Sequence, residues 1–194
     1  MTYQIHRYPA DLIDVVILNG ERVVIRPVLP QDEDLTTAFF GGLSAAARQQ
    51  RFLSAMRSLP PGLVKRLTQV DYTEHLALVA EVFRDGGETV IAEARYARGA
   101  DPSAAEFAVA VAEPWQGLGL ARLLLGKLIE RAAHSGVRRL VGETLASNER
   151  MLKLAGSAGF AISRSAEVRG LMHLEKLLPS WSVAPPALAA AAAA

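Results

Sequence analysis

The spacing of apolar and polar positions predicts two β-hairpins in the first half of the chain. β-Branched runs on either side of Asn19-Gly20 predict a hairpin over residues 11–28, because both residues of such a tight turn need positive φ angles. A second hairpin is predicted around the turn residues 84–87. Four more strands are predicted from apolar runs between turn residues. They are 106–113, 138–145, 160–168 and 171–178.

Helical spacing and capping residues predict five helices, three of them short and placed between the hairpins. The short helices are expected at 31–40, 45–52 and 60–70, with Gly41-Gly42 ending the first and Ser44 capping the second. The longest helix follows a glycine-rich turn and has an apolar stripe at Leu120, Leu124 and Leu128. The fifth runs from Glu149 to about Ala158, where Gly159-Phe160 ends it.

This order of elements predicts an α/β (α+β) domain, built as a single mixed, mostly antiparallel central sheet flanked by helices. With 194 residues the chain is long enough for one domain that buries its own core. We assign residues 1–179 to that domain. Residues 180–194 form a low-complexity Ala/Pro tail, which we expect to be disordered.

Composition excludes several classes of function. The chain has no Cys, which excludes disulfides, thiolate zinc sites and a cysteine nucleophile. Its four His are far apart in sequence and do not form an HExxH pattern, so no metal site is predicted. A net charge of +1 argues against nucleic-acid binding. No apolar run reaches the roughly 20 residues that span a bilayer, so we expect a cytoplasmic protein without membrane partners.

The segment 106–134 predicts a binding site for an anion. An apolar strand, the turn QGLGLA (Gln116–Ala121) and a long helix follow one another, which aims backbone N–H groups and a positive helix end at one point. Two nucleotide motifs fail here. A Walker A loop would need Gly and Ser or Thr where Ala121 and Leu128 stand, and the Rossmann pattern would need Gly in place of Arg122.

The same segment resembles the acyl-CoA motif of the GCN5-related N-acetyltransferase (GNAT) superfamily, in which a strand is followed by [QR]-x-x-G-x-[GA]. Gln116, Gly119 and Ala121 match this pattern, and Asn148 matches the residue that opens the next helix. The strings VVIRPVLPQDEDL, AEFAVAVAEPWQGLGLARLLL and RRLVGETLASNERMLKLAGSAGF are similar to the acetyltransferase domain of bacterial protein lysine acetyltransferases. The resemblance covers nearly the whole chain.

The resemblance implies acetyl-CoA as co-substrate and no metal. Backbone groups of the central strand are expected to hold the thioester, and the glycine turn and Asn148 the rest of the cofactor. The cofactor-binding set is therefore Val109, Ala110, Val111, Gln116, Gly117, Leu118, Gly119, Leu120, Ala121, Arg122 and Asn148.

Strand parity singles out Glu106 as the general base. Glu106 shares one face of its strand with Ala108 and Ala110, which leaves space beside the carboxylate, and the glutamate of the AEF string is the base that the resemblance implies. The alternatives that we rank lower are Glu113, Glu93 and Glu81. No Tyr follows Asn148 to protonate the leaving thiolate, so Tyr72 or water is considered for that role.

Three functions remain open from the sequence. The first is acetyl transfer from acetyl-CoA to a lysine of a protein, with acyl-CoA synthetases as the substrates that the resemblance implies. The second is acetylation of a small amine, and the third is a non-catalytic module that senses acyl-CoA. The glycine turn fits all three, and Glu106 favours catalysis over sensing.

Overall fold

The computed structural model describes residues 7–179, which form one eight-stranded sheet with helices on both faces. The strands are β1 (Asp14–Leu18), β2 (Glu21–Pro27), β3 (His75–Arg84), β4 (Gly87–Arg98), β5 (Ala104–Val111), β6 (Arg139–Leu145), β7 (Ala161–Arg164) and β8 (Leu171–Leu177). The α-helices are α1 (Glu33–Gly42), α2 (Ala45–Phe52), α3 (Pro61–Thr68), α4 (Leu120–His134) and α5 (Glu149–Ser157). Short 3-10 helices occupy Ala10–Leu12, Pro30–Asp32 and Glu113–Trp115.

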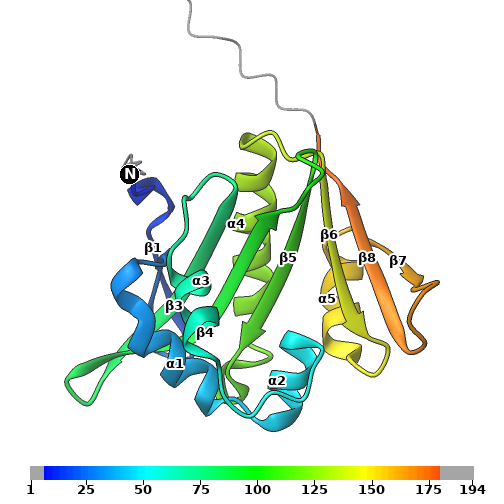
Figure 1. Cartoon of the computed structure of the whole chain (residues 1–194). Coiled ribbons are helices and arrows are strands. Elements are labelled where there is room, and N and C mark those ends of the chain that lie inside the picture. The colour runs from blue at the N-terminus through cyan, green and yellow to red at the C-terminus, as the bar shows by residue number, and fades with distance from the viewer. Residues whose placement is uncertain (1–6, 180–194) are drawn as a thin grey trace, which may run out of the picture.

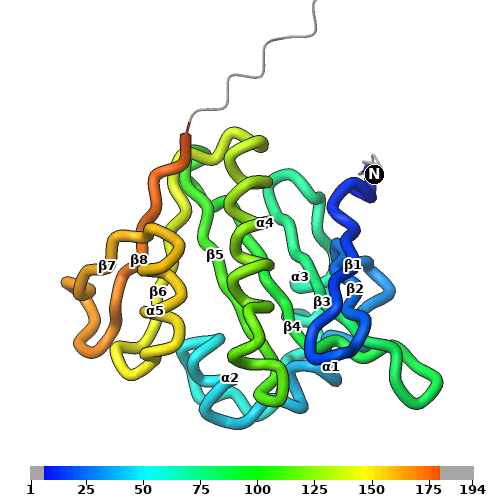
Figure 2. The backbone as a smooth tube through the Cα atoms, turned by 180° about the vertical axis from the view of Figure 1, so that it is seen from behind, coloured from blue at the N-terminus to red at the C-terminus, as the bar shows by residue number. Residues whose placement is uncertain are grey.

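The sheet confirms the predicted fold class. Its strand order is β1-β2-β3-β4-β5-β6-β8-β7, and β5 with β6 is the parallel pair in an otherwise antiparallel sheet. Figure 1 shows α1, α2 and α3 on the near face of the sheet, and Figure 2, from behind, shows α4 and α5 on the other face. We call these the α1–α3 face and the α4–α5 face.

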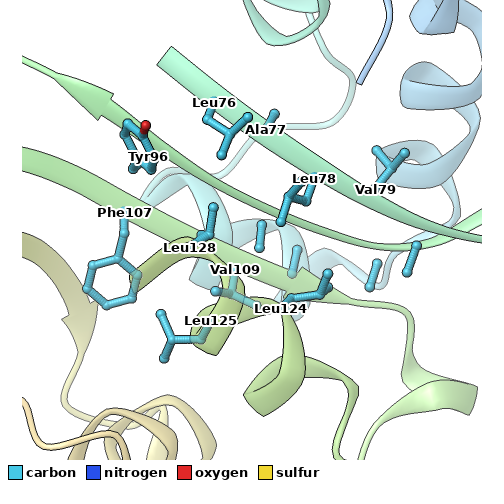
Figure 3. Packing of buried hydrophobic residues seen from close by; sticks show 14 of the residues in the cluster. Leu76, Ala77, Leu78, Val79, Tyr96, Phe107, Val109, Leu124, Leu125 and Leu128 are labelled. Atoms are coloured by element: carbon cyan, nitrogen blue, oxygen red, sulfur yellow. The ribbon is translucent and has the colours of Figure 1, made fainter. Parts of the chain in front are cut away.

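One part of the core lies between the sheet and α4, and another includes the buried Phe39 and Phe40 of α1 and Leu67 of α3. Cross-strand rows such as Leu76–Tyr96–Phe107 are set by the antiparallel register and face the leucine stripe of α4 (Figure 3). Leu124, Leu125 and Leu128 of that stripe are fully buried. The side of β5 that carries Phe107 and Val109 therefore belongs to the core.

Some predicted boundaries were wrong, for local reasons. The first helix ends at the predicted Gly41-Gly42 pair, but it includes both glycines, because neither adopts a positive φ angle. The first strand begins at Asp14, because residues 10–12 form a 3-10 turn instead. The strand predicted over 160–168 is reduced to β7, which lies at the exposed sheet edge. The predicted disordered tail lies outside the described residues.

Candidate active site

The sheet opens between β5 and β6. The two strands pair only from Ala104–Arg139 to Glu106–Val141 and then diverge (Figure 1). A cleft of about 190 Å³ occupies the opening and reaches both faces of the sheet. Glu106, Ala108 and Glu143 line it from the α1–α3 face, and Val109 and Thr144 from the other. Beside the opening, the register of β5 with β4 is continuous.

Gly142 sets how closely the strands approach where they part. A Cβ at Gly142 would lie 2.8 Å from a ring carbon of Phe107 and 3.3 Å from the Phe107 carbonyl oxygen. The ring itself is held by Phe160, at 4.8 Å between centroids. Only glycine therefore allows β6 to pass the Phe107 side of β5 without a shift in the core.

Backbone groups of β5 point into the opening. The N–H of Ala112 donates to the carbonyl of Ile91 on β4, at 2.9 Å. Because N–H directions alternate along a strand, those of Val109 and Val111 point to the other edge, where β6 has already diverged. The N–H of Ala110 points toward β4. Two of the three predicted thioester donors thus face the cleft edge.

The glycine turn presents a run of free N–H groups. Gly117 and Gly119 have φ angles of 81° and 84°, in the left-handed region that glycine adopts without strain. Within the described chain, no backbone N–H from 117 to 122 donates a hydrogen bond; the first that does is Leu123, to Gly119. The α4 dipole adds positive potential at the same place. Free N–H groups and a positive helix end together are features that suit an anion such as a pyrophosphate.

Side chains brace this turn against the sheet. Gln116 donates through Nε2 to the carbonyl of Val111 at 2.9 Å and accepts a hydrogen bond from Arg150 of α5. Arg150 is an exposed cation at the turn that sequence reasoning missed, although its position in the first turn of α5 could have suggested it. Arg122 is exposed on α4 beside the turn. Lys127, further along α4, pairs with Asp14 at 2.8 Å.

Asn148 is the N-cap of α5, as predicted. Its Oδ1 accepts from the Met151 N–H at 3.2 Å, and its Nδ2 donates to Thr144 at 3.1 Å. The side chain is buried behind Thr144, which is the residue of this pair that lines the cleft. A direct contact of Asn148 with the cofactor stays a prediction.

Glu106 differs from the three alternative bases, Glu81, Glu93 and Glu113, in having no hydrogen-bond or ion-pair partner among the described residues. Its side chain is exposed, lines the cleft, and forms no hydrogen bond or ion pair with a described residue. Glu81 is paired with Arg26 at 2.8 Å, outside the cleft. Glu113 accepts the Ser44 N–H at 3.0 Å, and hydrogen bonding to Ser44 lowers its pKa. Glu93 is buried in the ionic cluster described next.

Buried charges fill the space above the alanines of β5. Glu93 is paired with Arg95 on the same strand and with Arg51 of α2, the latter at 3.5 Å. Burial acts to raise the pKa of Glu93, but the two guanidinium groups hold it below its ordinary value. Register places Arg95 beside Ala108 and Glu93 beside Ala110. The small face predicted as room for a substrate thus also makes room for this cluster.

Arg51 extends the cluster to the cleft. Its guanidinium stacks 4.8 Å from the Phe52 ring centroid, and its Nε has no hydrogen-bond partner among residues 7–179. Burial lowers the pKa of Arg51, against the attraction of Glu93 and, more weakly, of Glu106. Sequence reasoning missed this residue, because nothing local shows that α2 lies over β5.

Tyr72 is not placed to act as a general acid in the cleft. Its hydroxyl donates to the Val28 carbonyl at 3.0 Å, and its ring packs against Tyr8 at 5.6 Å. Both rings border a separate hollow near the described start of the chain.

Glu143 is a further cleft residue that sequence reasoning missed. The parity of the strand 138–145 could have placed it beside Glu106, had the parallel pairing been known.

No helix in the described part of the chain is long and apolar enough to cross a membrane. Across residues 7–179, no three His, Asp or Glu side chains are grouped so that they could hold a metal ion.

Known proteins similar to this chain are acetyltransferases. An acetyltransferase of Pseudomonas aeruginosa is 34% identical over 149 residues, or 77% of this chain and 80% of that protein. Acetyltransferase Pat of Mycolicibacterium smegmatis is 34% identical over 148 residues. These residues make up 76% of this chain but only 44% of Pat. The GNAT domain of S. lividans PAT superposes with a TM-score of 0.80 at 30% identity, covering 89% of this chain and 100% of that domain.

The cofactor and the family follow from the same comparisons. A solved structure from Salmonella typhimurium contains its cofactor acetyl-CoA; it is 22% identical, with a TM-score of 0.63 over 84% of this chain and 97% of that one, and shares the fold. GNAT acetyltransferases use acetyl-CoA, and the free N–H groups of the glycine turn fit its pyrophosphate. The model of the acetyltransferase (GNAT) family matches residues 48–160. The chain is an acyltransferase and belongs to the GNAT family of acetyltransferases.

Proposed function

We propose that this acetyltransferase transfers the acetyl group of acetyl-CoA directly to the ε-amine of a lysine on a protein, with Glu106 as general base. The observation that carries the proposal is the position of Glu106. It is an unpaired, exposed carboxylate in the cleft between β5 and β6, on the strand that leads into the glycine turn.

Backbone groups bind and orient the donor. The N–H groups of residues 117–122 hold the pyrophosphate, with Arg122 and Arg150 as flanking cations. The N–H groups of Val109 and Val111 donate toward the thioester oxygen. Such donors, fixed before the reaction begins, typically contribute about 3–4 kcal/mol each to stabilising the developing negative charge.

Glu106 removes the proton that keeps lysine from reacting. The carboxylate accepts a proton from the ammonium, directly or through one water, and the amine nitrogen then bonds to the acetyl carbon. The carbon–sulfur bond breaks, and its electron pair leaves on sulfur. The ammonium loses two protons in all, of which one ends on the CoA sulfur and one in solvent. No side chain need supply a proton, because thiolate is a good leaving group.

A protein acceptor is favoured by likeness to Pat and by the shape of the site. The cleft reaches the α1–α3 face between α2 and β6, and no described helix covers β8 or β7 on that face (Figure 1). A folded protein can therefore approach it. Acyl-CoA synthetases are the first acceptors to test, and the cytoplasm is the proposed setting; both follow from the sequence analysis.

The test incubates the protein with acetyl-CoA and an acyl-CoA synthetase, a blocked lysine peptide or spermidine. Released CoA is followed with a thiol reagent, and intact mass reports a gain of one acetyl group. Acetylation of a lysine in the synthetase or the peptide supports the proposal. Turnover of spermidine alone would assign a small-amine acceptor. Tight binding of acetyl-CoA with no turnover on any amine would indicate a sensing module instead.

A further inference from the structure

Two carboxylates face each other across the cleft. Register pairs Glu106 with Val141, and Glu143 is the next β6 residue on that same face. Both side chains are exposed, and both line the cleft. Glu143 forms no hydrogen bond or ion pair with any residue from 7 to 179. Its neighbour on β8 is His173, which the β6–β8 register places directly beside it.

Other acids on this side of the sheet are already neutralised. Glu93 is paired with Arg95 and Arg51, and Glu175 with Arg139 at 3.1 Å. Glu106 and Glu143 thus differ from their neighbours in keeping their charge available within the cleft. Arg51 lines the same cleft and attracts Glu106, while His173 lies beside Glu143 in the β6–β8 register.

Part of the same wall is apolar. Phe52 and Leu53, at the end of α2, line the cleft with the two carboxylates, and Leu53 is 37% exposed. A lysine side chain is complementary to this wall. Its long aliphatic stem packs on apolar surface, while its ammonium group interacts with charged or polar partners. An alcohol or an anionic acceptor would leave the second carboxylate without a partner.

We propose that Glu143 is an acceptor-binding residue, which holds the ammonium of a cationic amine while Glu106 takes its proton. Phe52 and Leu53 contact the aliphatic stem. One carboxylate in the cleft stays charged during the proton transfer, so the acceptor remains bound as it is deprotonated. This inference rests on the proposed function, because it assumes an amine acceptor, and it deepens that function by naming what selects the amine.

The experiment compares wild-type protein with Glu143→Gln, using the blocked pentapeptide Ala-Ala-Lys-Ala-Ala as acceptor. We expect KM for the peptide to rise about tenfold in Glu143→Gln. A hydrogen bond to a charged group that is partly shielded from water strengthens binding by about this factor. The value of kcat stays within about twofold, and the Kd for acetyl-CoA is unchanged. The difference in KM shrinks in 0.5 M NaCl, which screens the attraction between charges.

Two controls separate binding from folding and from net charge. Glu88→Gln removes the same charge from an exposed glutamate of β4 that lies outside the cleft, and leaves KM unchanged. Melting temperatures of both variants match wild type, because neither glutamate is buried or paired.

The outcomes decide between the inference and the function on which it rests. An unchanged KM, a rise in KM that is insensitive to salt, or a fall in kcat like that of Glu106→Gln would overturn the role of Glu143. If wild type acetylates only spermidine, the protein acceptor is wrong, and the same comparison of KM on spermidine still decides the inference. If wild type acetylates the synthetase alone, the same comparison of KM is made on the synthetase. If wild type acetylates none of the synthetase, the peptide and spermidine, both proposals fail.

Discussion

The two edges of β5 differ along a single strand. Toward β4, β5 is paired at seven positions, from Ala105–Arg98 to Val111–Ala92. Toward β6 it is paired at three and then left open. On the paired side, buried charges are neutralised by partners, as Glu93 is by Arg95 and Arg51. On the open side, backbone N–H groups and two carboxylates keep their hydrogen-bonding capacity.

The difference suggests a division of labour within the sheet. The paired side, β1 to β5, stabilises the fold and fixes the position of β5. The open side provides groups that a substrate can use. Substitutions of buried, paired groups should therefore act on the free energy of unfolding, and substitutions of exposed groups at the opening on binding and turnover.

The largest expected loss of stability is on the paired side. Arg26 of β2 bridges two buried acids, Asp32 at 2.6 Å and Glu81 at 2.8 Å. Arg26→Met leaves both carboxylates buried without a cation, which should lower the free energy of unfolding by about 3–5 kcal/mol. Urea denaturation measures the loss.

A matched variant on the open side sharpens this result. Arg139 of β6 also bridges two acids, Asp101 at 3.0 Å and Glu175 at 3.1 Å, but at the exposed surface. Arg139→Met should leave the urea midpoint nearly unchanged, because water solvates the charges that remain. Equal losses in the two variants would contradict the proposed division between the two sides.

The glycine turn should act on the cofactor. Gly119→Val forces a β-branched residue to a φ angle of 84°, which strains the turn by roughly 1–3 kcal/mol and moves its N–H groups. We expect the Kd for acetyl-CoA, measured by calorimetry, to rise about 100-fold, which corresponds to about 2.7 kcal/mol. Gly62→Val, at an exposed helical position with open space around it, is the control. An unchanged Kd in Gly119→Val would contradict the assignment of the turn.

A methyl group where the strands part should be costly. Gly142→Ala places a carbon against the Phe107 ring and carbonyl, and we expect a loss of about 1–3 kcal/mol in the free energy of unfolding. Gly126→Ala adds the same methyl group within α4, where space is open, and should stabilise by about 0.5–1 kcal/mol. Thermal melts that shift in opposite directions would support the close contact, and equal shifts would refute it.

The smallest expected effect is the pH dependence of the free energy of unfolding that His75, on the paired side, causes. Burial, helped by the adjacent Arg95, lowers the pKa of His75 to about 4. Below its unfolded pKa of about 6.5 the unfolded chain binds the proton first, so stability falls as pH drops from about 6.5 toward 4. We expect a loss of about 1–2 kcal/mol at pH 5 relative to pH 7.5.

His75→Gln provides the check, because it keeps an acceptor for Arg95, which lies 2.9 Å from the His75 ring. The substitution should flatten the dependence of urea stability on pH over this range. A variant that loses stability on acidification as steeply as wild type would assign the effect to other groups.

Local features of the fold were predictable from the sequence. Asn19-Gly20 and Asp85-Gly86 adopt the positive φ angles that their hairpin turns require. Ser44 caps α2 by accepting the Ala47 N–H, and the helix covers the predicted residues. The glycine turn, the long helix after it and the Phe/Val core face of β5 also follow from neighbouring residues. In each case the deciding interaction lies within a few residues of the signal.

Features that depend on distant residues were missed. The opening at Glu106 depends on β6, which follows a whole helix later, and on the Gly142–Phe107 contact. Arg51 reaches the cleft only because α2 lies over β5, and Glu143 becomes a neighbour of Glu106 only through the parallel register. Strand parity identified the face that Glu106 occupies, but could not show that a buried ionic cluster fills part of it.

The central claim is that Glu106, at the open edge of β5, takes the proton from the acceptor. The most direct measurement is a single-turnover acetylation of the blocked lysine peptide by wild type and Glu106→Gln, both saturated with acetyl-CoA. We predict a rate about 100- to 10,000-fold lower in Glu106→Gln, the range typical of a lost general base, with an unchanged Kd for acetyl-CoA. An acetyl-transfer rate equal to that of wild type, at the same Kd, would contradict the account.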